Sequence, residues 1–392
     1  MDISAIRNDT PGTRLIKHVN NAGCSLHPKP VVDAVQQFLE EESLIGGYEI
    51  AAKREAEIAE FYTAAATMLN CKSTNIAFVS SATDGFAKAL SSVPFKQGDY
   101  ILTTINDYAS YQIQFLSLQK RFGVQIIRAA NTASGEVDIN SMHELMKKYK
   151  PVLVSVTHVP NNTGMIQPVA LIGDLCEQEN ILYAVDVCQS AGQMPLDMQK
   201  IKCDFASFTL RKFMRGPRGA AVLYVSDKVL NLGLEPLFID MRGADWMQQN
   251  SYSPIPNATR FEFVEQSYAI LIGAKVAIQY YLNLGQENVF ARNRVISAYT
   301  REKLAAIPGI TLMDQGNDLS NIISALPAKK NIFEIKNELN RLGINIGAAQ
   351  KKFALLDFEQ KHIEGTLRIS PHYFNTHEEI DILVDSIHCL NP

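Results

Sequence analysis

Lys212 lies in the part of this sequence that is most typical of a reaction centre. The segment 209–219 reads Thr-Leu-Arg-Lys-Phe-Met-Arg-Gly-Pro-Arg-Gly and stands between two apolar runs. A charged run of this kind usually forms a solvated turn, but here Gly-Pro-Arg-Gly tightens the turn rather than extending it. A hydroxyl group and basic side chains suit a phosphate group, and a lysine amine can form an imine with an aldehyde. The segment therefore predicts a phosphate-binding turn that also carries a lysine nucleophile.

Four further polar turns follow apolar, strand-like runs. They are Ser81-Ala82-Thr83, the segment 106–111 with Tyr108, the segment 158–164 with Asn161, and the segment 186–189 from Asp186 to Gln189. In an open parallel sheet the carboxyl ends of the strands meet at one edge, and ligands bind there. Five polar turns at one edge of the sheet therefore predict a ligand-binding site there.

Taken singly, these residues also have structural interpretations. Ser81-Ala82-Thr83 can be a plain helix cap, or a place where backbone N–H groups and the Thr83 hydroxyl bind a phosphate at a helix N-terminus. Tyr108 can be a packing aromatic residue. Asp186 ends an apolar strand, so its carboxylate needs a cation or a protonated ring nitrogen to offset its desolvation.

The elements that must position these residues alternate along the chain. Segments of helical period, such as 140–149 and 169–178, separate short apolar or β-branched runs. This alternation is typical of βα units on a mostly parallel, buried sheet. The predicted strands are Ile76–Ser80, Tyr100–Thr104, Val124–Ala129, Val152–Thr157, Ile181–Asp186, Asp204–Phe208 and Ala220–Val225.

The end of the chain has a different pattern. Long helices are predicted over 266–284 and 287–306, followed by an α+β set and a closing helix over 376–390. The run Thr376-His377-Glu378-Glu379 is typical of a capping box. We therefore expect a large domain over residues 18–282 and a smaller one over 283–392, with residues 1–17 packing on the smaller one.

The composition excludes several classes of function. A formal net charge of −4 offers no electrostatic reason to expect nucleic acid or an anionic membrane as partner. The six cysteines form no CxxC pair and no zinc-like grouping with the eight histidines, so no metal site is expected. The N-terminus has no apolar stretch typical of a signal peptide, and no run is long enough to span a membrane. We expect a cytoplasmic protein.

Taken together, these segments resemble fold-type I pyridoxal-phosphate (PLP) enzymes, specifically the class V aminotransferase and cysteine-desulfurase group. The likeness runs in order from Asn20-Asn21-Ala22-Gly23 to the segment 368–376. Residues 185–193 resemble the segment whose aspartate pairs with the pyridine nitrogen. Arg211-Lys212, followed by Gly-Pro-Arg-Gly, resembles the Schiff-base segment of one branch, which carries Arg-Lys where desulfurases carry His-Lys. The resemblance implies a fold-type I α/β transferase, with a mostly parallel seven-stranded sheet in the large domain and a smaller α+β C-terminal domain.

The resemblance also implies roles for single residues. Lys212 would form the Schiff base with pyridoxal 5'-phosphate and move protons at the substrate Cα, and Asp186 would keep the pyridine nitrogen protonated. Arg368 would bind the substrate α-carboxylate as a bidentate pair. The other implied contacts are Asn161 and Gln189 to the phenolic oxygen, Ala82, Thr83, Thr209 and Arg211 to the phosphate, Tyr108 to the ring face, and Asn21 to the substrate pocket.

Two departures from the family pattern limit the implied function. Desulfurases carry a nucleophilic cysteine on a small-domain loop ahead of the substrate arginine, but here no cysteine lies between Cys203 and Cys389. A persulfide-forming desulfurase is therefore not expected. Many relatives also have Gly-Thr after Arg-Phe-Glu, through which a second subunit contacts the phosphate. This chain has Phe263-Val264 there, so the resemblance does not imply that contact, although it still implies a homodimer.

The leading hypothesis is a PLP enzyme that deprotonates the Cα of a small α-amino acid, for transamination or for C–S or β-elimination. An amino-acid epimerase of the same family is the alternative. A non-catalytic PLP-binding protein would be expected to lack Lys212 or Asp186, and both are present. An NAD(P) oxidoreductase would carry a Gly-x-Gly-x-x-Gly turn after a strand, and the sequence has none.

Overall fold

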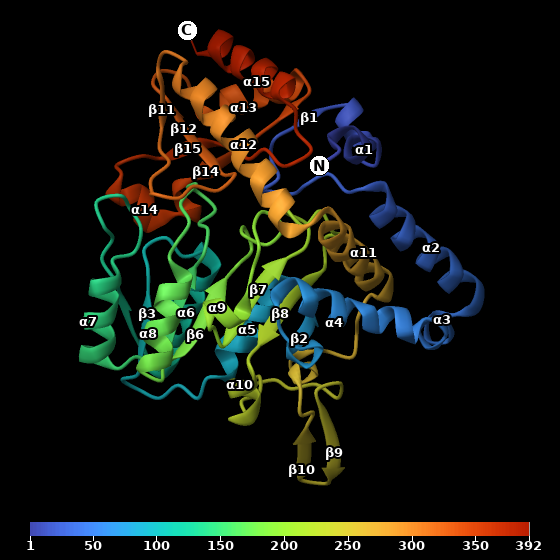
Figure 1. Cartoon of the computed structure of the whole chain (residues 1–392). Coiled ribbons are helices and arrows are strands. Elements are labelled where there is room, and N and C mark those ends of the chain that lie inside the picture. Colours follow the sequence, from blue (N-terminus) through green and yellow to red (C-terminus); the bar gives the residue numbers. More distant parts are fainter. Residues whose placement is uncertain (392) are drawn as a thin grey trace.

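Seven strands form the central sheet of the protein. Its structure is a computed structural model that describes residues 1–391. The strand order is β2-β8-β7-β6-β5-β3-β4, and only β8 runs antiparallel to its neighbours (Figure 1). All seven predicted strands are present, each within one residue of its predicted ends, and the predicted α/β fold is confirmed. The strands are β2 (Ile76–Val79), β3 (Tyr100–Thr103), β4 (Gln125–Arg128), β5 (Leu153–Thr157), β6 (Leu182–Asp186), β7 (Phe205–Thr209) and β8 (Ala221–Val225).

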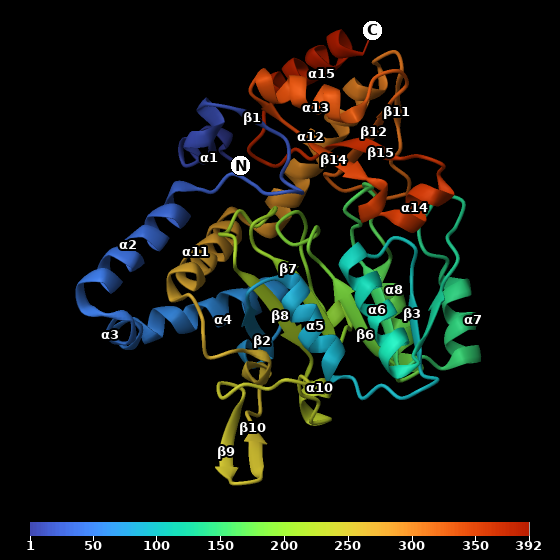
Figure 2. The same ribbon diagram turned by 180° about the vertical axis from the view of Figure 1, so that it is seen from behind.

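Both faces of this sheet are covered by helices (Figures 1 and 2). Side chains alternate between faces along a strand, and in β2 Ile76 and Phe78 belong to one apolar core while Ala77 and Val79 belong to another. This double burial explains why most of these strands are predominantly apolar. The first core includes α2 (Lys29–Ile45), α4 (Glu55–Leu69), α7 (Ile139–Tyr149), α8 (Val169–Gln178) and α11 (Tyr268–Leu284), and the second includes α5 (Ala82–Ser92) and α6 (Ala109–Phe122).

A second, antiparallel sheet of four strands lies beyond α11, with the order β11-β12-β15-β14. It shares a third apolar core with three helices, of which α15 opens with the predicted capping box between Thr376 and Glu379. The division at residue 283 stays a prediction. The elements are α12 (Gln286–Ala305), β11 (Ile310–Leu312), β12 (Ile323–Pro327), α13 (Ile332–Arg341), β13 (Ile344–Asn345), β14 (Gly347–Gln350), α14 (Leu355–Gln360), β15 (Gly365–Ile369) and α15 (His377–Leu390).

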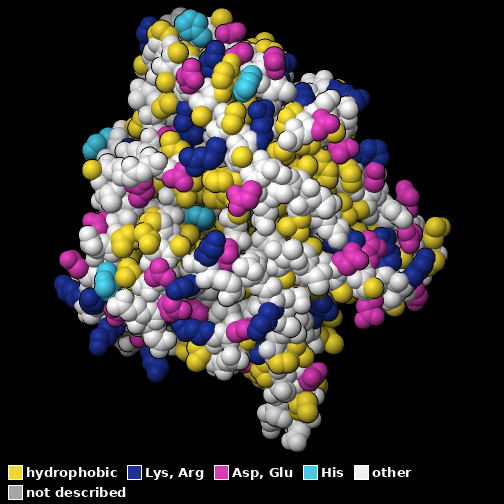
Figure 3. Space-filling view, viewed as in Figure 1, with side chains coloured by type: hydrophobic (Ala, Val, Ile, Leu, Met, Phe, Trp, Pro, Cys, Tyr) yellow, Lys and Arg dark blue, Asp and Glu magenta, His cyan; other side chains and the backbone are white. Residues whose placement is uncertain are grey.

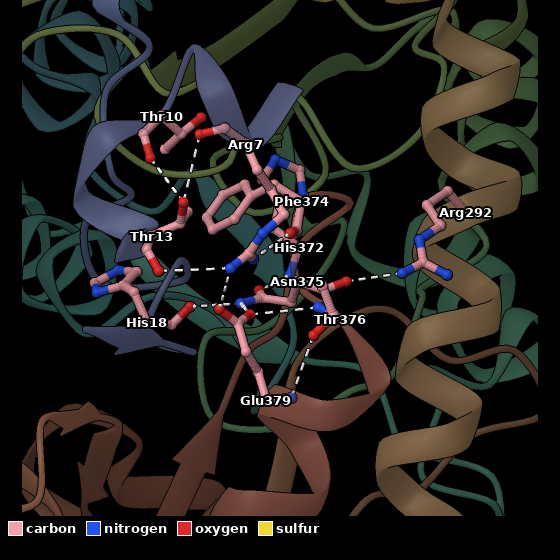
Figure 4. A network of polar contacts seen from close by, with 10 residues as sticks. All are labelled: Arg7, Thr10, Thr13, His18, Arg292, His372, Phe374, Asn375, Thr376 and Glu379. Atoms are coloured by element: carbon pink, nitrogen blue, oxygen red, sulfur yellow. Dashed lines mark hydrogen bonds and ion pairs between the residues drawn. The ribbon is translucent and has the colours of Figure 1, made fainter. Parts of the chain in front are cut away.

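The N-terminal segment is tied to the end of the chain (Figure 4). Arg7, on α1 (Ile3–Asn8), forms an ion pair with Glu379 at 2.9 Å and donates to the Phe374 carbonyl oxygen at 3.0 Å. Asn375 Nδ2 donates to the His18 carbonyl oxygen at 3.1 Å, and β1 (Lys17–His18) pairs in parallel with β13. These contacts place the segment that follows β1 beside the end of β15.

A hairpin of β9 (Ala244–Gln248) and β10 (Ser251–Pro254), which the sequence patterns did not predict, projects from the far end of the molecule (Figure 1). Its strands show no apolar alternation because most of their residues are exposed on both faces. Hydrophobic side chains are visible along this projection in the space-filling view (Figure 3). Among the described residues, no helix combines the length and apolar character needed to cross a membrane.

Candidate active site

One cavity at the carboxyl edge of the large sheet brings together the predicted cofactor residues. It lies where β5, β6 and β7 end and where α5 and α6 begin. Nine predicted residues line it, namely Ala82, Thr83, Tyr108, Asn161, Asp186, Gln189, Thr209, Arg211 and Lys212. Residues up to 130 positions apart meet there because parallel strands place their carboxyl ends side by side.

One end of the cavity is suited to an anion. The backbone of α5 starts there, and its N-cap Ser81 accepts a hydrogen bond from the Asp84 backbone N–H at 3.1 Å. Within residues 1–391, the hydroxyl groups of Thr83 and Thr209 make no hydrogen bond that would occupy them. A helix N-terminus with free hydroxyl donors is a ready site for a phosphate group.

Asp186 and Lys212 carry opposite charges in the buried part of the cavity. Asp186 is 4% exposed and accepts from the Cys188 backbone N–H at 2.8 Å. Burial raises the pKa of this carboxyl, while the charge of Lys212 acts in the opposite direction. Burial lowers the pKa of Lys212, and the nearby Arg211 and Arg368 add to that effect against Cys188 and Asp186. A lysine with a lowered pKa has more of the neutral amine that attacks an aldehyde.

Arg368 reaches the same region from β15 of the small sheet. Its Nη1 donates to the Asn161 carbonyl oxygen at 3.2 Å, and its Nη2 lies 3.5 Å from Asn20 Oδ1. Burial and the neighbouring Arg211 lower the pKa of Arg368 to about 10, so the group stays cationic at neutral pH. Its Nε is buried without a hydrogen-bond partner.

The charges of this region do not balance among the described residues. Lys212, Arg211 and Arg368 contribute three positive charges and form no ion pair, while Asp186 supplies one negative charge. The buried Gln189 Oε1 also has no hydrogen-bond partner. A ligand with a phosphate group, a protonated ring nitrogen and a polar ring oxygen, together with a substrate carboxylate, would match these groups. The residues therefore fit pyridoxal 5'-phosphate.

Asn21 is placed beside the cavity rather than in its lining. It is fully buried, its Nδ2 donates to the Ser370 carbonyl oxygen at 2.8 Å, and its Oδ1 accepts from Ser25 at 2.6 Å. Both polar atoms are thus used within the chain. Asn20, which the sequence patterns did not single out, is the neighbour that lies next to Arg368.

The sequence patterns also missed residues that line the cavity. Tyr111 lies one helical turn after Tyr108, and its hydroxyl is 3.2 Å from Ser207 Oγ. Thr157 Oγ1 accepts from the Tyr108 backbone N–H at 3.3 Å, which fixes the start of α6. The i, i+3 spacing of the two tyrosines was a usable signal, whereas the role of Thr157 depends on the packing of β5 beside β3.

A larger hollow of about 740 Å³ lies at the opposite edge of the sheet. Its charged side chains pair with one another: Lys72 with Asp227, and Lys228 with Asp204 at 3.4 Å. Because these pairs leave no excess charge or orphaned buried donor there, this hollow offers less to a ligand than the smaller cavity does.

His158, at the end of β5, is expected to make the protein sensitive to acid. It is 8% exposed, and burial lowers its pKa to about 4 from 6.5. A histidine with a lowered pKa in the folded state stabilises the fold above pH 6.5, and this contribution is lost as the pH falls towards 4. From pH 7 to pH 5, the free energy of unfolding should fall by about 2 kcal/mol more in the wild type than in His158→Gln. Urea unfolding of both proteins at both pH values measures the difference. An equal change in the free energy of unfolding in the wild type and in His158→Gln would contradict the prediction.

Comparison with known proteins identifies a family and several relatives that match nearly the whole chain. The family model described as aminotransferase class-V matches residues 18–383. A probable cysteine desulfurase of Pyrococcus abyssi is 26% identical over 386 residues, which cover 96% of this chain and 94% of the relative. One from Borreliella burgdorferi is 26% identical over 404 residues, which cover 97% of this chain and 94% of the relative.

Solved structures share the fold at lower identity. The apo cysteine desulfurase of Thermococcus onnurineus has a TM-score of 0.92 and 23% identity, covering 99% of this chain and 98% of the other. The cystine C–S lyase C-DES, in complex with cysteine persulfide, has a TM-score of 0.86 and 20% identity, covering 98% and 100%. Because the family model spans almost the whole chain, this protein is a member of the class V aminotransferase family and a PLP-dependent enzyme.

Proposed function

We propose that this enzyme removes the Cα proton of a small α-amino acid and cleaves a C–S bond by β-elimination, with transamination as the second candidate. The observation that carries the proposal is the convergence of Lys212, Asp186 and Arg211 in one cavity, with Arg368 beside it on Asn161. Among the described residues, neither arginine forms an ion pair. The C–S chemistry rests on the names of the relatives, and transamination on the description of the family model.

Bound PLP supplies an electron sink for the electron pair left at Cα. Lys212 holds the cofactor covalently and then takes or returns the proton at Cα, for which its lowered pKa makes it suitable. Asp186 would hold the proton of the ring nitrogen, because a buried carboxylate is stabilised by a cationic partner.

The remaining residues bind and orient. The backbone at Ala82, the hydroxyl groups of Thr83 and Thr209, and the Arg211 guanidinium hold the phosphate. The side chains of Asn161 and Gln189 would hold the phenolic oxygen, and Tyr108 would pack on the ring. Arg368 binds the α-carboxylate and, with Asn20 beside it and Asn21 supporting the strand behind, fixes which Cα bond faces Lys212.

The epimerase alternative would need a second proton donor. The described lining of the cavity contains one lysine, no histidine and no glutamate. A single proton-transferring lysine favours reactions that remove and return protons on one face. Of the two tyrosines in the described lining, Tyr111 has its hydroxyl 3.2 Å from Ser207 Oγ, which leaves Tyr108 as the candidate for the other face. Tyr108→Phe should therefore preserve elimination and abolish any inversion.

A persulfide carried by the protein is not part of the proposal. Cys188 is the one cysteine in the described lining of the cavity, and burial, together with the charge of Asp186, raises its pKa to about 12. A thiol of that pKa has almost no thiolate at neutral pH and is a weak nucleophile. Sulfur should therefore leave as a free product.

Product analysis of the purified, PLP-loaded enzyme tests the function. We expect cysteine or cystine to yield a keto acid and ammonia with sulfide or a free persulfide. Keto acid that forms only when a second keto acid accepts the amino group would indicate transamination. Inverted amino acid alone would overturn both in favour of the epimerase. A protein that gains no visible absorption with PLP would be a non-catalytic relative.

We also propose that the enzyme is a cytoplasmic homodimer, with the β9–β10 hairpin and its base in the interface. Phe238, Met241 and Trp246 are 79%, 76% and 81% exposed there, and clustered apolar side chains of this size indicate an interaction surface. Light scattering should give twice 43.5 kDa for the wild type. Phe238→Glu with Trp246→Glu should weaken the dimer at least roughly 100-fold, while Leu15→Glu, at an equally exposed position, should not. A monomeric wild type would contradict the proposal.

A further inference from the structure

Asp357 is a buried carboxylate on α14, outside the cavity described above. It is 3% exposed, its Oδ2 accepts from Asn162 Nδ2 at 2.7 Å, and its Oδ1 lies 2.9 Å from Lys361 Nζ. Asn162 is also 3% exposed and belongs to the loop between β5 and α8. We call Asn162, Asp357 and Lys361 the clasp. Both views show α14 lying between the small sheet and the loops above the large one (Figures 1 and 2).

The loop that the clasp holds carries Asn161 and is also tied at two other points, to Arg368 on β15 and to the segment 320–322 that precedes β12. Arg368 Nη1 donates to the Asn161 carbonyl oxygen at 3.2 Å, and the Ser320 backbone N–H donates to the Gly164 carbonyl oxygen at 2.7 Å. A Cβ at Gly164 would collide with the Ile322 carbonyl oxygen. The loop is therefore in backbone contact with the segment that leads into β12, and this contact helps to fix the position of Asn161 relative to Arg368.

The helix at the other end of the clasp is anchored to the strand of Arg368. Phe358, 1% exposed, packs with Ala349 and Ala354 in a small apolar core. Ala349 belongs to β14, which pairs with β15, and Gly347 is the partner of Arg368 in that pairing. A displacement of α14 is therefore transmitted through β14 to the strand that carries Arg368.

We propose that Asp357 is a positioning residue for the substrate carboxylate: through Asn162 it holds the loop of Asn161 in register with β15, so that Arg368 keeps its orientation. This inference deepens the proposed function and rests on it. A carboxylate that binds a planar guanidinium through two hydrogen bonds depends on the orientation of that group. Because the Arg368–Asn161 hydrogen bond joins the two elements directly, a loosened loop frees the guanidinium to rotate.

The test uses the PLP-loaded enzyme and propionate, a carboxylate that has no amino group and cannot react. Asn162→Ala is expected to weaken propionate binding about 10-fold in calorimetry, because loss of the Asn162–Asp357 hydrogen bond loosens the loop and frees the Arg368 guanidinium to leave its binding orientation. With the amino-acid substrate, KM should rise by about the same factor and kcat should change less than roughly threefold. The PLP content should match that of the wild type.

Asn75→Ala is the matched control. Asn75 is likewise 3% exposed and donates to a lysine-paired carboxylate, Asp227, at 2.8 Å, but at the opposite edge of the sheet. Both variants should lower the melting temperature, whereas only Asn162→Ala should weaken propionate binding. Equal propionate affinity in the two variants would mean that the clasp only stabilises the fold, and this result would overturn the proposal.

Exchange of the two partners provides the rescue. Asn162→Asp combined with Asp357→Asn restores one amide–carboxylate hydrogen bond with the donor and acceptor reversed, and we expect it to recover most of the propionate affinity. An exchange variant that folds and loads PLP but binds propionate as weakly as Asn162→Ala would contradict the positioning role. A wild type that binds no PLP would instead refute the proposed function, so the two failures are distinguishable.

Discussion

Replacement of Lys212 by alanine is expected to abolish turnover, with a loss of at least about 10³-fold, because general acid–base catalysis alone contributes roughly 10²–10⁴-fold. The variant also loses the covalent attachment of the cofactor, which the lowered pKa of Lys212 favours. PLP should still bind, but non-covalently, through the phosphate end of the cavity. Absorption spectra before and after borohydride reduction measure the attachment, since reduction fixes PLP to the wild type and not to Lys212→Ala.

Lys200→Ala is the control for this experiment. Lys200 is exposed on the short helix α9 (Met198–Ile201) and forms no ion pair within residues 1–391. It should keep wild-type turnover and covalent labelling. If borohydride still fixed PLP to Lys212→Ala with undiminished yield, another lysine would hold the cofactor and the assignment of Lys212 would be wrong.

Replacement of Asp186 by asparagine is expected to lower kcat about 10³-fold while KM changes little. The carboxylate is buried and its pKa is raised by that burial, so it gains most from a cationic ring nitrogen beside it. Removal of one member of a buried charge pair costs about 3–5 kcal/mol. In Asp186→Asn this cost would destabilise the ring with a protonated nitrogen, which is the form that withdraws electrons from Cα. Steady-state kinetics measure the split between kcat and KM.

The control for Asp186→Asn is Asp204→Asn. Asp204 is 5% exposed, precedes β7 at the other edge of the sheet, and accepts from the Ser226 hydroxyl at 2.9 Å. Its replacement should affect stability and leave kcat unchanged. A fall in kcat of the same size in both variants would mean that Asp186 acts only through the fold.

The strands and the edge where the site forms could be predicted because both depend on local patterns. β2, β5, β6, β7 and β8 are buried on both faces, so the sequence of each is predominantly apolar. The polar turns that follow these apolar strands are therefore easy to recognise in the sequence. The β9–β10 hairpin could not be predicted because its exposed strands are not constrained by a core, so its sequence carries no alternation.

Positions within the site were harder to predict where long-range packing chooses between neighbours. Asn20 and Asn21 are adjacent, and only the parallel bridge between Asn20 and Ser370 turns one towards Arg368 and the other into the interior. The Asn162–Asp357 hydrogen bond joins residues 195 positions apart. No periodicity of either segment indicates that contact.

The sequence by itself determined the seven-stranded sheet, the edge that carries the chemistry, and the lysine and aspartate at its centre, because burial and strand polarity act on each segment separately. Only the tertiary structure decided how the small sheet meets this edge, through Arg368, Asn20 and the clasp. These contacts depend on the relative placement of two sheets that are far apart in the chain. That placement follows from the packing of side chains across the contact, and no single segment of the sequence encodes it.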